Sequence, residues 1–200
     1  MSEGKASGPW GSRAAISLFL LAAIYFSAVR SPAGAAQADP QHSAKLKAVF
    51  LYNLAIFTDW PADAFPEPAT PLSICVLGDE WVSSELNYRI AEKSVNGRGI
   101  RIRRSILGPE LRSCHVLLVG SLEIKQLPEV LRILQGSSVL TVSDMDRFVE
   151  GGGAIQFSVE EDRVRFEVKL TAVERARLKI SSKLLNLSRI TMDVRRSGGN

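Results

Sequence analysis

Three short, mostly apolar runs limit what this chain can fold into. They occupy residues 72–77, 115–119 and 139–142, and segments of helical length separate them. Runs of this length and composition are typical of strands buried on both faces, as in parallel sheets covered by helices. The pattern predicts one three-layer α/β domain with a mostly parallel central sheet flanked by helices.

The remaining segments add helices and a hairpin. Helices are predicted over residues 43–57, 80–93, 121–135 and 144–150, and over most of 171–187 with a break near Lys179. Pro128 lies inside the third helix and predicts a kink or a restart there. Residues 100–105 alternate apolar and basic side chains, which indicates a half-exposed edge strand. Residues 155–159 and 164–170 predict an antiparallel hairpin at the C-terminal side of the sheet.

Residues 1–38 have the features of a signal peptide. Lys5 and Arg13 precede an uncharged apolar run over residues 14–29, and small residues lead to Ala38. This arrangement predicts export and cleavage after Ala38. An uncleaved anchor is the alternative, because the run is long for a signal and short for a membrane span. We therefore expect a periplasmic domain over residues 39–194 and a disordered tail over 195–200.

The charge balance bears on the kind of partner. The chain has a formal net charge of +4. Residues 1–38 contribute three positive side chains and one negative, so +2 remains for the rest of the chain. A nearly neutral domain of this kind argues against nucleic acid as its main partner.

Cys75 and Cys114 are the two cysteines of the chain. An isolated pair in an exported protein predicts one disulfide, since the compartment is oxidising. Cys75 lies within one buried run and Cys114 directly precedes another. Neighbouring strands are about 4.8 Å apart, a spacing that a disulfide can bridge.

Catalytic motifs were sought among the acidic residues and glycines. A phospho-acceptor domain needs acids after its first and third strands, but Val119-Gly-Ser121 ends the third run without one. Asp79 and Asp144 are therefore interpreted as turn or helix-capping residues. No glycine-rich nucleotide motif opens a helix, because Gly151-Gly-Gly153 precedes a strand. These patterns predict a protein that is not an enzyme and carries no cofactor.

The histidines give no support to metal binding or nucleophilic catalysis. His115 follows Cys114, but adjacent residues of a strand point to opposite faces. Neither His42 nor His115 has the spacing of a metal ligand relative to a cysteine or carboxylate. We expect no metal site and no catalytic residue.

Two groups of charged residues remain as binding candidates. Arg98, Arg101, Arg103 and Arg104 either protect an edge strand against unwanted pairing or bind an anionic surface, and the first interpretation is favoured. Glu167 alternates with apolar residues of the predicted hairpin. It lies either on a solvated face beside cations or, if a helix covers that face, in a ligand site.

A set of ordered motifs resembles the YfiR family of bacterial periplasmic regulators. The motifs are Lys47-Ala-Val-Phe-Leu-Tyr-Asn-Leu-Ala-Ile-Phe57 with Trp60-Pro61, Ile74-Cys-Val-Leu-Gly-Asp79, Val95-Asn-Gly-Arg98, Cys114-His-Val-Leu117, Leu140-Thr-Val-Ser-Asp144, Gly152-Gly-Ala-Ile-Gln-Phe157, Val164-Arg-Phe-Glu-Val168 and Leu178-Lys-Ile-Ser-Ser-Lys-Leu-Leu185. They cover nearly all of residues 39–194. The resemblance implies a disulfide between Cys75 and Cys114, in agreement with the pairing expected above.

The resemblance also implies a function. It suggests a regulator that represses an inner-membrane diguanylate cyclase through the cyclase's periplasmic sensor domain, and so controls cyclic di-GMP. It further suggests an outer-membrane lipoprotein as a second partner, and a homodimer remains open. We expect contacts on the first helix and the final hairpin–helix region, with Phe50, Phe57, Glu167 and Val173 as candidates. The alternative is a small-ligand-binding module with its pocket near Glu167 and Val173.

Overall fold

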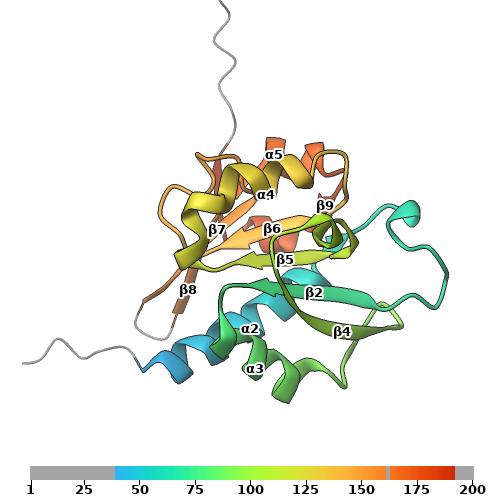
Figure 1. The fold of residues 1–200 in the computed structure, drawn as a ribbon, viewed down its shortest axis with the longest axis horizontal. Coiled ribbons are helices and arrows are strands. Elements are labelled where there is room, and N and C mark those ends of the chain that lie inside the picture. The colour runs from blue at the N-terminus through green and yellow to red at the C-terminus, as the bar shows by residue number, and fades with distance from the viewer. Residues whose placement is uncertain (1–38, 161–162, 192–200) are drawn as a thin grey trace, which may run out of the picture. The chain divides into compact units, whose positions relative to one another are not determined.

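The computed structural model describes residues 39–160 and 163–191 (Figure 1). The predicted signal peptide and the predicted tail lie outside these residues. Within them, no helix combines the length and the apolar character needed to cross a membrane.

An α/β architecture with a mostly parallel sheet is confirmed. Within the described residues, eight strands form one sheet in the order β10-β8-β7-β6-β5-β2-β4-β3. Their bounds are β2 Leu72–Leu77, β3 Ser94–Val95, β4 Arg98–Ser105, β5 Val116–Val119, β6 Leu140–Ser143, β7 Ile155–Glu160, β8 Arg163–Lys169 and β10 Arg189–Thr191. Among the described strand pairs of this sheet, β3–β4 and β7–β8 are antiparallel, and the second pair is the predicted hairpin.

Helices cover both faces of the sheet (Figure 1). On one face, α2 (Pro40–Ile56) and α3 (Glu80–Ile90) pack over Ile74, Val76 and Leu118. On the other face, α4 (Leu127–Ile133) packs over Leu117 and Val119. Because alternate residues of β2 and β5 serve opposite faces, these strands need apolar side chains throughout, which explains the apolar runs.

The first helix begins three residues earlier than its apolar pattern predicts. The Asp39 side chain caps the helix by accepting a hydrogen bond from the Gln41 amide at 3.0 Å, and Pro40 occupies the first turn. Leu51 and Leu54 are fully buried, whereas Val49 and Ile56 are exposed by 41% and 37%. The helix is therefore a core element that also presents apolar side chains outward.

The predicted helix over residues 144–150 is wrong, since turns occupy this segment. The Ser143 hydroxyl accepts a hydrogen bond from the Met145 amide at 3.0 Å, and so competes with helical pairing. Arg147 adopts a positive φ of 60°, which an α-helix cannot contain. Glycine at position 153 then leaves room for the Phe148 ring, because a Cβ there would lie 2.1 Å from it.

The remaining helical predictions are confirmed in part. The third helix restarts at Pro128, as a 3-10 segment over Ser121–Gln126 gives way to α4. The 171–187 segment contains α5 (Leu170–Arg175) and α6 (Ser182–Leu185). At the predicted break, β9 (Lys179–Ile180) pairs with β1 (Thr58–Asp59) in a separate two-stranded sheet.

The predicted disulfide is present between Cys75 and Cys114, whose Cα atoms are 5.9 Å apart. Cys75 lies in β2, and Cys114 lies in the loop that enters β5. Both side chains are buried against the α4 face, together with Leu111. The bridge fixes two central strands to each other across a sequence separation of 39 residues.

Removing this bridge should lower the free energy of unfolding by roughly 4 kcal/mol, because the unfolded chain regains the entropy of a long open loop. Chemical denaturation of a Cys75→Ala/Cys114→Ala variant measures the loss. Reduced wild-type protein should show a similar loss, and reductant should leave the double variant unchanged. Equal stability of reduced and oxidised protein would contradict this role.

Candidate functional site

The carboxyl edge of the parallel sheet is where the topology changes direction. In the described sheet the chain passes from β2 to β4 on one side and returns to β5 on the other. Open α/β sheets commonly bind their ligands outside such a change of direction. Here that position lies beyond the ends of β2 and β5, at Gly78, Asp79 and Gly120.

A lysine and two aspartates meet at this edge of the sheet. The Lys47 ammonium of α2 lies 2.6 Å from Asp144 Oδ2 and 3.3 Å from Asp79 Oδ2. Asp79 also caps α3, because its Oδ1 accepts a hydrogen bond from the Val82 amide at 3.0 Å. The predicted capping role of Asp79 is thus confirmed, whereas Asp144 pairs with Lys47. We call these three residues the edge cluster.

The electrostatics of the edge cluster favour a structural role. Burial lowers the pKa of Lys47, but its hydrogen bond to Asp144 and the charges of Asp144 and Asp79 outweigh this and raise the pKa overall. The side chain therefore stays an ammonium, which is neither a base nor a nucleophile. At the same edge, Gly120 must lack a side chain, because a Cβ there would lie 2.8 Å from the Gly78 carbonyl oxygen.

Among residues 39–160 and 163–191, no three His, Cys, Asp or Glu side chains are arranged to hold a metal ion.

His115 belongs to an aromatic cluster at the opposite, amino edge of the sheet. Its Nδ1 accepts a hydrogen bond from the Ser73 amide at 3.0 Å, so Nε2 carries the proton and faces the Ala64 carbonyl oxygen at 3.2 Å. The ring stacks on Phe65 at 4.4 Å between centroids, and Trp60 lies edge-on at 6.0 Å. Burial lowers the pKa of His115, and the Arg98 charge adds to this.

The four arginines of the basic segment differ in their contacts. Arg98 donates to carbonyl groups of the 67–70 loop, Arg103 donates to Ser113 Oγ at 2.6 Å, and Arg104 donates to Ser83 Oγ at 3.3 Å. Beyond Gly99, β4 has only β2 as a strand partner among the described residues. Residues 100–105 therefore form an edge, as predicted, and its arginines also tie β4 to neighbouring segments.

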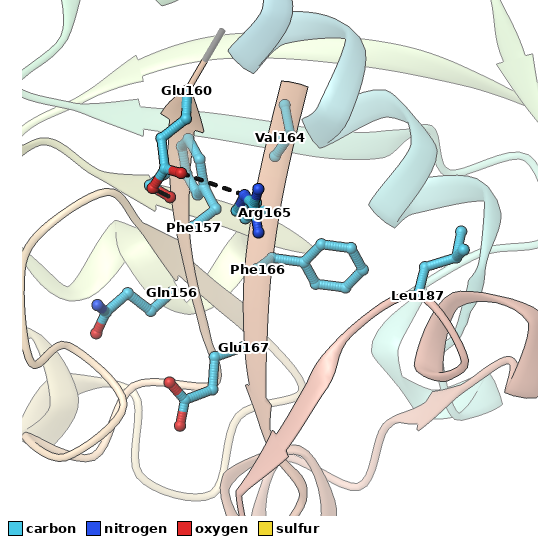
Figure 2. Close-up of a pocket in the computed structure, with 9 residues that line it drawn as sticks. Gln156, Phe157, Glu160, Val164, Arg165, Phe166, Glu167 and Leu187 are labelled. Atoms are coloured by element: carbon cyan, nitrogen blue, oxygen red, sulfur yellow. Dashed lines mark hydrogen bonds and ion pairs between the residues drawn. The ribbon is translucent and has the colours of Figure 1, made fainter. Parts of the chain in front are cut away.

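Glu167 lines a groove of about 410 Å³ on the β7–β8 hairpin (Figure 2). It is half-buried and lies in register with Gln156 of β7 and Arg189 of β10. Figure 2 shows Phe166 pointing toward Leu187, while Glu167 leaves the strand on the side of Gln156. An ion pair between Arg165 and Glu160, at 3.2 Å, lies farther along the same hairpin.

The other candidate contacts are placed elsewhere. Phe50 is only 6% exposed and packs between Phe157 and Phe166, with ring centroids 5.2 and 5.1 Å away. Val173 is buried and lines a separate cavity of about 490 Å³ between α5 and β9. Phe57 is half-buried at the end of α2, where its carbonyl accepts from the Ser181 amide at 2.9 Å. The structure thus does not bring Glu167 and Val173 into one pocket.

The outer surfaces of α2 and α3 carry large apolar side chains that the sequence pattern did not single out. Trp81 and Tyr88 of α3 are 59% and 82% exposed, and a spacing of seven residues places them on the same face of the helix. Val49 and Ile56 have the same spacing on α2. We call these four residues the helical apolar face. The spacing of apolar residues along a helix identifies its buried face. It does not identify aromatic side chains that lie among polar residues on the exposed face.

The fold and the edge cluster define a structural class, an α/β domain with a mostly parallel sheet whose carboxyl edge carries an ion-paired lysine. Comparison with protein families then identifies the group. The YfiR/HmsC-like family model matches residues 44–189. The chain belongs to the YfiR/HmsC-like family, and the resemblance noted from its motifs is confirmed.

Replacing Lys47 by methionine should lower the free energy of unfolding by about 2 kcal/mol, because two part-buried carboxylates lose their counter-charge. Denaturant titrations of Lys47→Met, Asp144→Asn and the double variant measure it. The double variant should lose less than the sum of the two single variants, since the pair acts as a unit. The exposed pair Arg132–Glu129 supplies the control, and Arg132→Met should leave stability unchanged. If the losses of unfolding free energy in the two single variants add up in the double variant, Lys47 and Asp144 are not energetically coupled.

His115 should make the folded protein less stable in acid. The unfolded chain takes up a proton near pH 6.5, whereas the folded protein resists it to lower pH. The contribution of His115 is present above that value and is lost as the pH falls through the lowered pKa. The free energy of unfolding should drop as the pH falls from about 7.5 through the lowered pKa of folded His115, and His115→Gln should flatten this dependence. Identical pH profiles for wild type and variant would contradict the assignment, and His42→Gln serves as the control.

Proposed function

We propose that this protein is an exported regulator that represses a membrane-bound diguanylate cyclase by binding the cyclase's periplasmic sensor domain. Membership of the YfiR/HmsC-like family is the observation that carries the proposal. The ion-paired lysine and aspartates at the carboxyl edge agree with a protein that acts by contact.

The helical apolar face is the surface that we assign to the sensor domain. Tryptophan and tyrosine are enriched among the residues that dominate binding energy in protein interfaces. Trp81 and Tyr88 offer these side chains on an exposed helix that already packs against α2. The groove at Glu167 adjoins α2 through the Phe166–Phe50 contact, so it forms a second part of the proposed surface.

Repression follows from a difference in affinity between two states of the cyclase. A partner shifts a conformational equilibrium only as far as it binds one state more tightly than the other. The regulator therefore binds the inactive form of the sensor domain more tightly than the active form. An outer-membrane lipoprotein that sequesters the regulator would reverse the effect by mass action.

A clean deletion of the gene tests the pathway. Cyclic di-GMP should rise, adhesion should increase and swimming should decrease, because the cyclase loses its repressor. Complementation with the wild-type gene should restore all three. Unchanged cyclic di-GMP in the deletion strain would rule out this function.

Trp81→Ala/Tyr88→Ala tests the surface. The purified variant should stay folded, since both side chains are exposed, and should bind the sensor domain at least about 30-fold more weakly. Isothermal titration measures the affinity, and circular dichroism measures the fold. The matched control is Ile106→Ala, which removes another exposed apolar side chain, on the loop after β4. A loss of affinity in the control alone would place the interface there instead.

A further inference from the structure

The loop that connects β1 to β2 is held to the sheet mainly by side chains. This loop, residues 60–71, leaves the end of β1 and returns to the start of β2 (Figure 1). None of its residues is buried, and its regular structure is the 3-10 turn Ala62–Ala64. Among the described residues, its backbone groups make backbone–backbone hydrogen bonds only within the loop. We call it the 60–71 loop.

His115 and Arg98 hold the middle of the 60–71 loop. His115 Nε2 lies 3.2 Å from the Ala64 carbonyl oxygen, and its ring stacks on the Phe65 ring. The Arg98 guanidinium lies over the same Phe65 ring, 3.9 Å from its centroid, and Nη1 donates to carbonyl groups of residues 67–70. A segment without buried side chains or backbone bonds to its surroundings has low local stability, so these contacts decide its position.

The hydrogen bonds of His115 require a neutral imidazole. Nδ1 accepts from the Ser73 amide at 3.0 Å, and a backbone amide can only donate. The single proton of the ring is therefore on Nε2, which donates to Ala64. An imidazolium carries a proton on both nitrogens, so it cannot keep the bond to Ser73. Because His115 is only 4% exposed, water does not readily replace the lost partner.

The surrounding charges do not favour a protonated ring. Strands β2 and β5 carry no charged side chain, and Arg98 of β4 opposes a second positive charge. The acids of the neighbouring chain are all exposed, and they are Asp59, Asp63 and Glu67. Asp63 is ion-paired with Arg177 at 2.8 Å. Burial lowers the pKa of His115 and Arg98 adds to this, so the ring is neutral at neutral pH and gains its proton only in acid.

We propose that His115 is a pH-dependent switch that attaches the 60–71 loop to the amino edge of the sheet. The neutral ring holds the loop through Ala64 and Phe65. The protonated ring loses Ser73, rotates out of its position and gives up both contacts with the loop. The loop is thus attached above the pKa of folded His115 and detaches as the pH falls through it.

The rest of the sheet remains folded when the 60–71 loop detaches. The disulfide fixes the entry into β5, and backbone pairing joins β2 to β4 and β5. At its start, the loop follows the β1–β9 pair, which keeps the end of α2 in place. Acid therefore uncovers the half-buried rings of Trp60 and Phe65 at the amino edge without unfolding the domain.

Hydrogen exchange followed by NMR tests the proposal in the full chain, expressed with its own N-terminus and purified from the exported fraction. The ring signals of His115 report its protonation, and the amides of Ser73 and Phe65 report the hydrogen bond and the loop. Protection is expressed relative to an unfolded chain at the same pH, which removes the intrinsic pH dependence of exchange. From about pH 7.5 downward, both amides should lose protection at least about tenfold, with the midpoint of the ring titration. Amides of the β7–β8 hairpin should keep theirs.

Two variants and a control assign the effect to His115. His115→Gln cannot titrate, so protection at Phe65 should no longer depend on pH. Arg98→Gln removes a neighbouring positive charge, so the His115 titration and the loss of protection should move together to higher pH. The control is His42→Gln in the first turn of α2, which should leave both curves unchanged.

Three results would overturn the proposal. The first is constant protection at Ser73 and Phe65 while His115 gains its proton. The second is the same pH-dependent loss in His115→Gln. The third is an equal loss in the β7–β8 hairpin, which would show unfolding of the whole domain instead of a local switch. None of them bears on repression of the cyclase, because Trp81 and Tyr88 lie outside the 60–71 loop.

Discussion

The edge cluster is the interaction on which the arrangement of this domain depends. Lys47 comes from the helix that precedes the sheet, and it bonds to acids that follow β2 and β6. One side chain thereby fixes α2 against the ends of two parallel strands. The same contact stands at the edge where related sheet topologies place their ligands. A structural ion pair therefore takes the position that a ligand has in those topologies.

The outer surfaces of α2 and α3 differ in character from the carboxyl edge. On α3, Trp81 and Tyr88 are exposed aromatic side chains, and on α2, Val49 and Ile56 are exposed aliphatic ones. Aromatic side chains are enriched in protein interfaces, so this surface suits a protein partner.

Local patterns were sufficient to predict most of the fold. The apolar runs at β2, β5 and β6 can only be buried on both faces, which fixes a parallel sheet covered by helices. The disulfide followed from two cysteines beside neighbouring strands in an oxidising compartment. The wrong helix prediction for residues 144–150 has a local cause as well. The hydrogen bond to the Ser143 hydroxyl and the positive φ of Arg147 both oppose a helix, and the spacing of apolar residues reveals neither.

The sites were harder to predict, because they depend on contacts between distant segments. Asp144 lies 97 residues from Lys47, and nothing near either residue indicates the pair. A partial signal existed, as Asp79 and Asp144 each follow a buried strand and parallel strands end at a common edge. Glu167 and Val173 are close in sequence, yet a strand and a helix carry them to different cavities. Phe50 is an aromatic residue of the kind often found in binding sites, but the rings of Phe157 and Phe166 in the hairpin cover it.

The disulfide and the His115 cluster limit how the amino edge can change. Cys114 and His115 are consecutive, and their side chains serve opposite faces of the sheet. On one face the bridge fixes the entry into β5, and on the other the imidazole fixes the 60–65 loop through Ala64 and Phe65. The position of Trp60 relative to β2 is consequently set by covalent and aromatic contacts.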